Sequence, residues 1–80
     1  MQKFLPRQIE GVLAGVVMKE RKSGTYKISV RTNEPLSAAD ICASLGGGGH
    51  RLAAGCELSG RETEVRNIIL KAVEKEIKSL

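Results

Sequence analysis

The chain has 80 residues, enough for one small domain with a single hydrophobic core. Its 41% hydrophobic and 28% charged composition excludes a disordered tail, and one Tyr, one Phe and no Trp exclude an open sheet that stacks several bases. The net charge of +4, from 13 basic and 9 acidic residues, favours a polyanionic partner.

The first half of the chain predicts two strands. We expect residues 1–8 to be a linker or an artificial boundary and the domain to cover residues 9–80. Residues 9–20 are almost continuously apolar and partly β-branched, which is typical of a strand covered on both faces. The polar stretch 21–24, which ends in Gly24, predicts a hairpin connection. Apolar and polar residues then alternate, which predicts a second strand over residues 25–32 with Arg31 on its polar face.

The second half predicts two helices. Ser37 and Asp40 resemble a capping box, so we expect a short helix from about residue 37 to residue 45. One or two helical turns are expected to restart at residue 50, followed by a brief strand at residues 56–58. A second capping box, Ser59 with Glu62, opens a long C-terminal helix. Its predicted buried stripe consists of Val65, Ile68, Ile69, Ala72, Val73 and Ile77.

These elements predict an α+β fold. The expected order is β-β-α-(glycine loop)-β-α, in which helices pack on a small, mainly antiparallel sheet. The apolar run over residues 12–18 is too short to span a membrane. Two cysteines, Cys42 and Cys56, are too few for a disulfide scaffold and lack the spacing of a metal motif. We therefore expect free thiols in a cytoplasmic protein.

The glycine run is the main candidate functional feature. Gly46, Gly47, Gly48 and Gly49 directly precede His50, the only histidine, and then Arg51. Four consecutive glycines carry a high entropic cost, which is offset where the backbone turns sharply or a ligand comes close. Their exposed N–H groups, an imidazole and a guanidinium are donors suited to an anion. The run is neither a Walker A loop, since no Gly-Lys-Ser/Thr follows it, nor a Rossmann fingerprint, since no strand leads directly into it.

The sequence offers little to a catalytic centre of its own. With one Asp and one His in the whole chain, a two-metal hydrolytic site is excluded. Spacing allows Cys42 or Cys56 to act as a nucleophile with His50, but no third group is present to orient the histidine.

Two motifs resemble one known family. Residues 46–55, GGGGHRLAAG, resemble the signature of the DHH-associated C-terminal domain of DHH-family phosphoesterases, which include RecJ-like exonucleases and bacterial oligoribonuclease/pAp phosphatases. Residues 27–32, KISVRT, resemble the "KvSlRS" strand of the same family. Thr32 stands where serine is common and keeps the hydroxyl. The resemblance extends from about Ile9 to the last helix. Related glycine-rich domains occur in alanyl-tRNA synthetases, but His50 after the glycines favours the phosphoesterases.

The resemblance implies a substrate-binding role. In this family an N-terminal DHH domain holds manganese and hydrolyses the substrate, while the C-terminal domain grips it. This chain would then contain no catalytic residue and no metal ligand, and its partners would be the DHH domain and short RNA, single-stranded nucleic acid or mononucleotide phosphates.

The resemblance also implies a role for each site residue. The backbone of residues 46–49 would lie against a phosphate or sugar, His50 would donate to a phosphate oxygen, and Arg31 would pair with an anion. Arg51 stands where lysine or proline is common, which leaves its role open. The alternative is a standalone nucleic-acid-binding or dimerisation module, and a homodimer stays open in either case.

Overall fold

The computed structural model describes the backbone of residues 2–9 and 12–80 and the side chains of residues 14–80. Within these ranges the chain forms strands and helices in the order β1 (Gln2–Ile9), β2 (Val12–Lys22), β3 (Thr25–Thr32), α1 (Ala38–Ala43), β4 (Gly48–His50), β5 (Ala53–Ser59) and α2 (Glu62–Lys78). No helix in this part of the chain is both long and apolar enough to cross a membrane.

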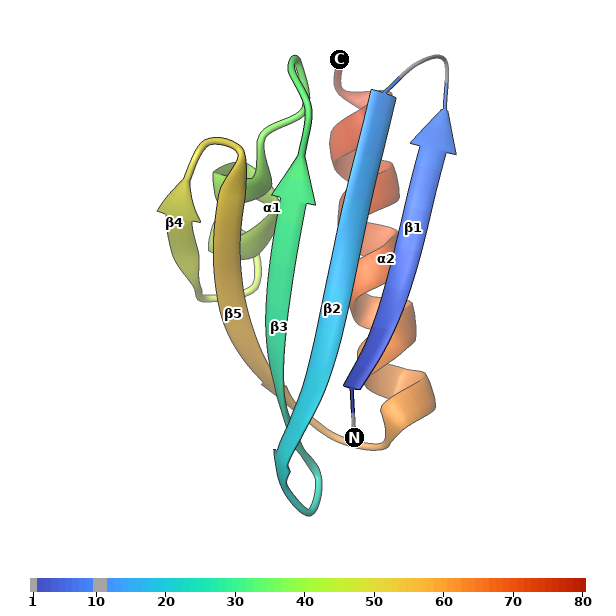
Figure 1. The fold of residues 1–80 in the computed structure, drawn as a ribbon, viewed down its shortest axis with the longest axis vertical. Helices are drawn as coiled ribbons and strands as arrows, with labels where there is room; N and C mark the ends of the chain where they lie inside the picture. The colour runs from blue at the N-terminus through green and yellow to red at the C-terminus, as the bar shows by residue number, and fades with distance from the viewer. Residues whose placement is uncertain (1, 10–11) are drawn as a thin grey trace.

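The described strands form one antiparallel sheet in the order β1-β2-β3-β5-β4. Both helices lie on the same side of this sheet, with α2 behind the β1-β2-β3 part and α1 behind β4 and β5 (Figure 1). The opposite face of the sheet is not covered by either helix. The predicted α+β class, with an antiparallel sheet and helices packed on it, is confirmed.

The core lies between the sheet and the helices. Alternate residues of β2 and β3 are buried on the helix side, and α2 contributes three buried residues to the same layer. The central members of this core are Ala14, Val16, Met18, Tyr26, Ile28, Val30, Val65, Ile69 and Val73. On the other face of β2, Gly15 and Val17 are only half-buried. The expectation of a strand covered on both faces is therefore wrong, because both helices cover one face only.

The predicted hairpin between the two strands and the predicted start of the first helix are confirmed. The β2–β3 hairpin turns at Gly24, which has a φ of 79°, and β3 has the bounds that the alternation predicts. At the start of α1, the Ser37 hydroxyl accepts a hydrogen bond from the Asp40 N–H at 3.2 Å. The buried Thr32 hydroxyl donates to the Leu36 carbonyl at 2.7 Å and fixes the segment between β3 and α1.

Two segments differ from the sequence-based expectation in their secondary structure. Strand β1 lies in the segment assigned to a linker and pairs with β2 along its whole length. Pro6 lies within β1, which is an edge strand, where a residue without an N–H is tolerated. Residues 50–54 form the end of β4, a turn and the start of β5 instead of helical turns. Here pairing of β5 with β3 overrides the local helix propensity of the alanines.

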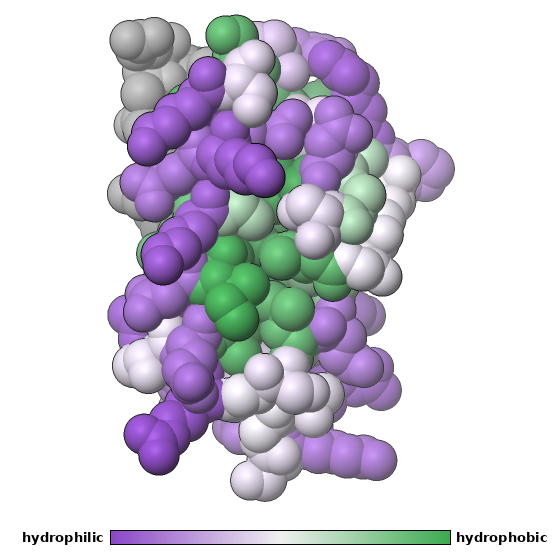
Figure 2. All heavy atoms as spheres, turned by 180° about the vertical axis from the view of Figure 1, so that it is seen from behind, coloured by the Kyte–Doolittle hydropathy of each residue, from purple (hydrophilic) through white to green (hydrophobic). Residues whose placement is uncertain are grey.

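The last helix begins later than expected and buries a narrower stripe. Its N-cap is Arg61, not Ser59, and the Glu64 carboxylate accepts a hydrogen bond from the Arg61 N–H at 3.0 Å. Ile68, expected in the core, is 41% exposed. Figure 2, which looks onto the helix side of the molecule, shows an apolar area between hydrophilic margins. Part of the surface on this side of the molecule is therefore apolar.

Candidate functional site

Arg31 and His50 lie in one cross-strand row on the sheet face that the helices do not cover. In the register, Arg31 lies opposite Ala53 on β5, and Ala53 lies opposite His50 on β4. Side chains directly opposite each other in an antiparallel sheet project to the same face. Two strand spacings separate the backbones of Arg31 and His50 by roughly 10 Å. The small side chain of Ala53 stands between them, so a ligand of that width can meet both.

A shallow groove of about 350 Å³ lies on this face. It is lined from three neighbouring strands by Lys27, Ser29, Val30, Arg31, Gly48, Gly49, Ala53, Ala54 and Gly55. One wall is cationic and comes from β3, while the floor and the other wall are glycine and alanine backbone from β5 and β4. No lining residue carries a carboxylate. Strand β5 therefore joins the two sequence motifs into one surface that is suited to an anion.

Gly46 has a structural role at the end of α1. Its φ is +86°, a conformation that glycine adopts without strain. The Gly46 N–H donates to the Ala43 carbonyl at 3.1 Å, and the Gly47 N–H donates to the Cys42 carbonyl at 2.8 Å. These two bonds form a Schellman motif, which satisfies the last carbonyls of the helix.

Gly47 and Gly49 are required for close contact with β5. A Cβ at Gly47 would overlap the Gly55 carbonyl oxygen and lie 2.6 Å from the Cys56 Cβ. A Cβ at Gly49, where φ is +151°, would lie 2.7 Å from the Ala54 Cα. Both glycines therefore let β4 pack directly on the neighbouring strand.

Gly48 differs from the other three glycines. A Cβ at this position would meet no atom of the described chain within 4 Å, and its φ lies outside the left-handed region. The fold of this domain thus gives no reason for glycine here, and Gly48 lines the groove. Its open backbone leaves room for a molecule from outside the chain.

The structure does not bring every predicted site residue into the groove. Arg31 lines it and is exposed, without a partner among the side chains of residues 14–80. His50 is exposed beside the groove but is not one of its lining residues. The Arg51 Nε lies 2.9 Å and 3.0 Å from the two carboxylate oxygens of Glu34, so this guanidinium is engaged outside the groove. A ligand role for Arg51 stays a prediction from the sequence alone.

Lys27 and Ser29 line the groove but were not selected as site residues from the sequence. They occupy the same face of β3 as Arg31, since alternate residues of a strand share a face. The KISVRT motif contained this signal, because its polar residues recur at every second position.

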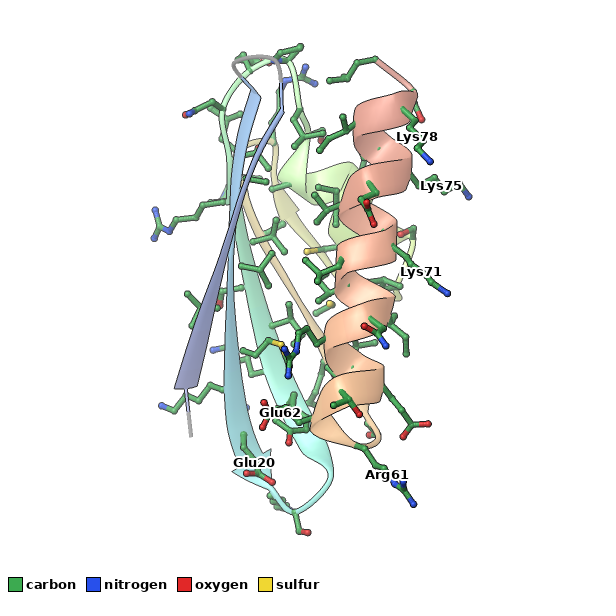
Figure 3. All side chains as sticks on the ribbon, turned by 90° about the vertical axis from the view of Figure 1, so that its right-hand side faces the viewer. Glu20, Arg61, Glu62, Lys71, Lys75 and Lys78 are labelled. Atoms are coloured by element: carbon green, nitrogen blue, oxygen red, sulfur yellow. The ribbon has the colours of Figure 1, made fainter. Side chains whose placement is uncertain are left out.

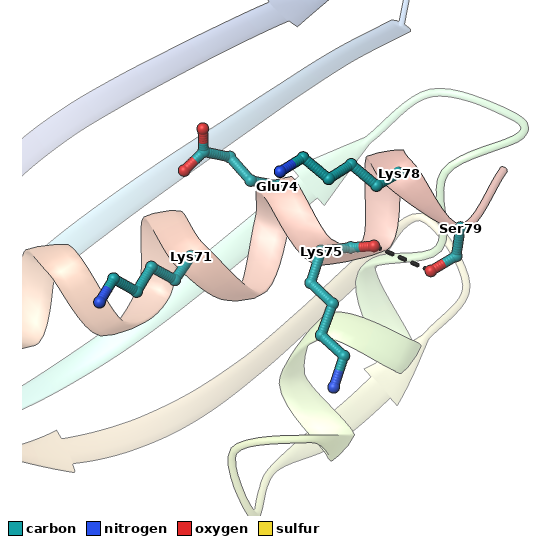
Figure 4. Close-up of a pocket in the computed structure, with 5 residues that line it drawn as sticks. All are labelled: Lys71, Glu74, Lys75, Lys78 and Ser79. Atoms are coloured by element: carbon teal, nitrogen blue, oxygen red, sulfur yellow. Dashed lines mark hydrogen bonds between the residues drawn. The ribbon is translucent and has the colours of Figure 1, made fainter.

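A second, larger hollow of about 420 Å³ lies at the C-terminal end of α2. Figure 4 shows its lining residues, Lys71, Glu74, Lys75, Lys78 and Ser79, all from the last turns of the helix and its C-cap. The three lysines project from the side of α2 that faces away from the sheet (Figure 3). The hollow contains no residue of either motif and is not walled by a second element. We therefore assign the candidate site to the smaller groove on the sheet.

The residues present do not fit a manganese ion. Among those that the structure describes, no group of three or more His, Cys, Asp or Glu residues is placed to hold a metal. The groove offers cationic and neutral donors, which bind anions and repel a metal cation. We therefore assign no metal-dependent step to this chain.

Two free cysteines lie beneath the glycine loop. Cys42 in α1 and Cys56 in β5 are both buried. Interaction with the Cys56 thiol, together with burial, raises the pKa of the Cys42 thiol far above its usual range. The same interaction lowers the pKa of the Cys56 thiol, against the opposing effect of burial. Cys56 is also the more accessible of the two residues, since it is 8% exposed and Cys42 is 0% exposed.

We expect iodoacetamide at mildly alkaline pH to modify Cys56 before Cys42, because the thiolate is the nucleophile. Peptide mapping by mass spectrometry at successive times will give the two rates. In concentrated urea, where the thiols are separated, the rates should become similar. Equal rates in the folded protein, or faster labelling of Cys42, would contradict this assignment.

Comparison with known proteins places both motifs within one family match. The model of the DHHA1 domain family matches residues 5–79. The chain is also similar to the bifunctional oligoribonuclease and PAP phosphatase NrnA of Thermus thermophilus, with 38% identity over 74 residues. This alignment covers 91% of the present chain and 22% of the relative. The chain thus spans about a fifth of the length of that relative.

Proposed function

The chain belongs to the DHHA1 domain family, and we propose that it is the substrate-binding domain of a DHH-family phosphoesterase. In this role it holds the phosphates of a nucleotide or short nucleic acid. A separate DHH domain, outside this chain, contributes manganese and carries out the hydrolysis. Free thiols at Cys42 and Cys56 support a cytoplasmic location, where thiols stay reduced.

The observation that carries this proposal is the composition of the groove on the uncovered sheet face. Its charged lining residues, Lys27 and Arg31, are both cations, and both are exposed. In the row between them, opposite Ser29, Gly55 and Gly48 present backbone without side chains. A phosphate ester needs donors on its oxygens and space for its sugar, and this arrangement supplies both.

Each site residue acts by binding and orienting the ligand. The Arg31 guanidinium donates two parallel hydrogen bonds to phosphate oxygens, which fixes the direction of the phosphate as well as its position. His50, at the same level two strands away, donates from its imidazole to a second oxygen or to a neighbouring phosphate. The backbone of Gly48, with Gly49 beside it, lies against the sugar, and Gly46 and Gly47 hold this backbone in place.

The substrate class follows from the similar protein and from the groove. That relative is an oligoribonuclease and PAP phosphatase, so short RNA and pAp are the ligands we propose. The open, shallow shape of the groove suits a short linear ligand, and the scarcity of aromatic residues leaves phosphate contacts as the main source of affinity.

Titration followed by NMR tests the proposal. We expect pAp and a 5′-phosphorylated dinucleotide to shift the amide signals of residues 27–31 and 48–55, and the purified chain to hydrolyse neither, with or without manganese. Shifts concentrated on the lysines of α2 would contradict the assigned site. Robust manganese-dependent hydrolysis by this chain alone would contradict the assignment of hydrolysis to a separate DHH domain. Binding of long polyanions with a steep salt dependence and no preference for a terminal phosphate would favour the standalone nucleic-acid-binding module instead.

A further inference from the structure

We propose that Arg31, Ser29 and Lys27 form three successive phosphate subsites, so that the groove takes a phosphorylated oligonucleotide of three nucleotides in extended form. This inference rests on the proposed function, because its first subsite is the Arg31 phosphate site. It adds two residues, Ser29 and Lys27, and a defined length of ligand.

The spacing of these three residues carries the inference. They occupy alternate positions of β3, face the same side of the sheet and all line the groove. With a rise of about 3.3 Å per residue, neighbouring subsites lie roughly 7 Å apart and the outer two roughly 13 Å apart. One nucleotide step joins successive phosphorus atoms through about six backbone bonds, the same number as two residues of a polypeptide. An extended nucleotide chain along β3 therefore presents one phosphate to each of the three side chains.

The donors match this arrangement. Arg31 offers a planar fork for a terminal phosphate, which carries the most charge and the most free oxygens. Ser29 offers a hydroxyl for the second phosphate, and it lies in one row with Gly55 and Gly48. These two glycines leave that row without side chains, so the sugar next to the second phosphate has room. Lys27 offers an ammonium group for the third phosphate.

Lys27 is available for this role. Its cross-strand neighbour is Glu57, but the Glu57 carboxylate lies 3.9 Å from the Arg21 guanidinium. Glu57 lines an adjoining hollow with Arg21 and is not a lining residue of the groove. Among the side chains of residues 14–80, Lys27 has no carboxylate partner. Its charge is thus directed to the groove, at the end opposite Arg31.

Calorimetric titration with pA, pApA and pApApA tests the three subsites, since each ligand adds one phosphate. For the unmodified chain we expect affinity to increase at every step. Lys27→Ala should weaken pApApA binding by about three- to tenfold, a typical effect of one charge-assisted contact at an exposed site. The same substitution should change pA and pApA binding by less than about twofold. Lys27→Arg should restore pApApA binding, and Lys75→Ala, which removes the same charge from α2, should leave all three affinities unchanged.

The outcomes separate this inference from the proposed function. An equal loss for all three ligands in Lys27→Ala would show general electrostatic attraction and overturn the third subsite, as would no loss for any of them. In both cases the proposed function would still hold if Arg31→Ala weakens the binding of pA. A chain that binds none of the ligands, or binds pA without dependence on Arg31, would overturn both.

Discussion

Substitution of Gly47 by alanine will lower the free energy of unfolding by about 3 kcal/mol, the upper range for forcing extra atoms into a packed site. The added Cβ would overlap the Gly55 carbonyl oxygen and lie 2.8 Å from the Cys56 Cα. Both are backbone atoms of the central sheet, so neither can move aside by changing a rotamer. For a domain of this size, such a loss is a large part of the total stability.

Gly48→Ala is the matched control, because it makes the same chemical change one residue later. No described atom lies within 4 Å of the added Cβ, so we expect the unfolding free energy to change by less than about 1 kcal/mol. Urea denaturation followed by circular dichroism will measure both variants. If the two alanines cost the same, the packing of β4 on β5 would differ from that in the structure.

The control also carries a functional expectation. If a nucleotide lies against the backbone at residue 48, Gly48→Ala should weaken pAp binding while the fold stays intact. The pAp affinity of Gly47→Ala, measured at a temperature where this variant is still folded, tests the opposite case. There the added Cβ faces β5 and not the nucleotide. Stability and affinity thus assign different roles to adjacent, chemically identical residues.

The parts of the fold predicted well from the sequence are those set by local patterns. The alternation around Ile28 defines β3, and Ser37 with its capping hydrogen bond defines the start of α1. The expectations that were wrong depend on distant partners. Residues 50–54 became a hairpin because β5 pairs with β3, and Ile68 is exposed because none of the elements that the structure describes covers that side of α2. Neither result can be predicted from residues nearby in sequence.

The candidate site also combines features that local sequence patterns predict with features that depend on distant residues. The resemblance to a family selected Arg31 and the glycine run, since these residues lie in continuous motifs. The sequence could not show that Gly46, Gly47 and Gly49 serve the fold while Gly48 does not, because that depends on where β5 lies. It also could not show that Arg51 is held by Glu34, which is 17 residues away in sequence. These contacts join segments that are distant in sequence, so a local pattern does not reveal them.

We expect Arg31→Ala and His50→Ala each to weaken binding of pAp by about 1–3 kcal/mol, the range for a hydrogen bond with a charged partner. Both side chains are exposed on the uncovered face of the sheet, so their removal should leave the fold unchanged. Arg31 should have the larger effect, because it lines the groove and its planar guanidinium can donate two parallel hydrogen bonds to one phosphate. Titration followed by NMR will give both affinities.

Arg51→Ala is the control for the loss of an arginine next to His50. Its guanidinium already binds the Glu34 carboxylate at 2.9 Å, so a ligand would have to compete with a neighbouring anion for it. We therefore expect this substitution to leave pAp affinity nearly unchanged. Equal losses in Arg31→Ala and Arg51→Ala would mean that the net charge of the loop, and not the groove on β3, attracts the nucleotide. Unchanged affinity in both Arg31→Ala and His50→Ala would reject the site itself.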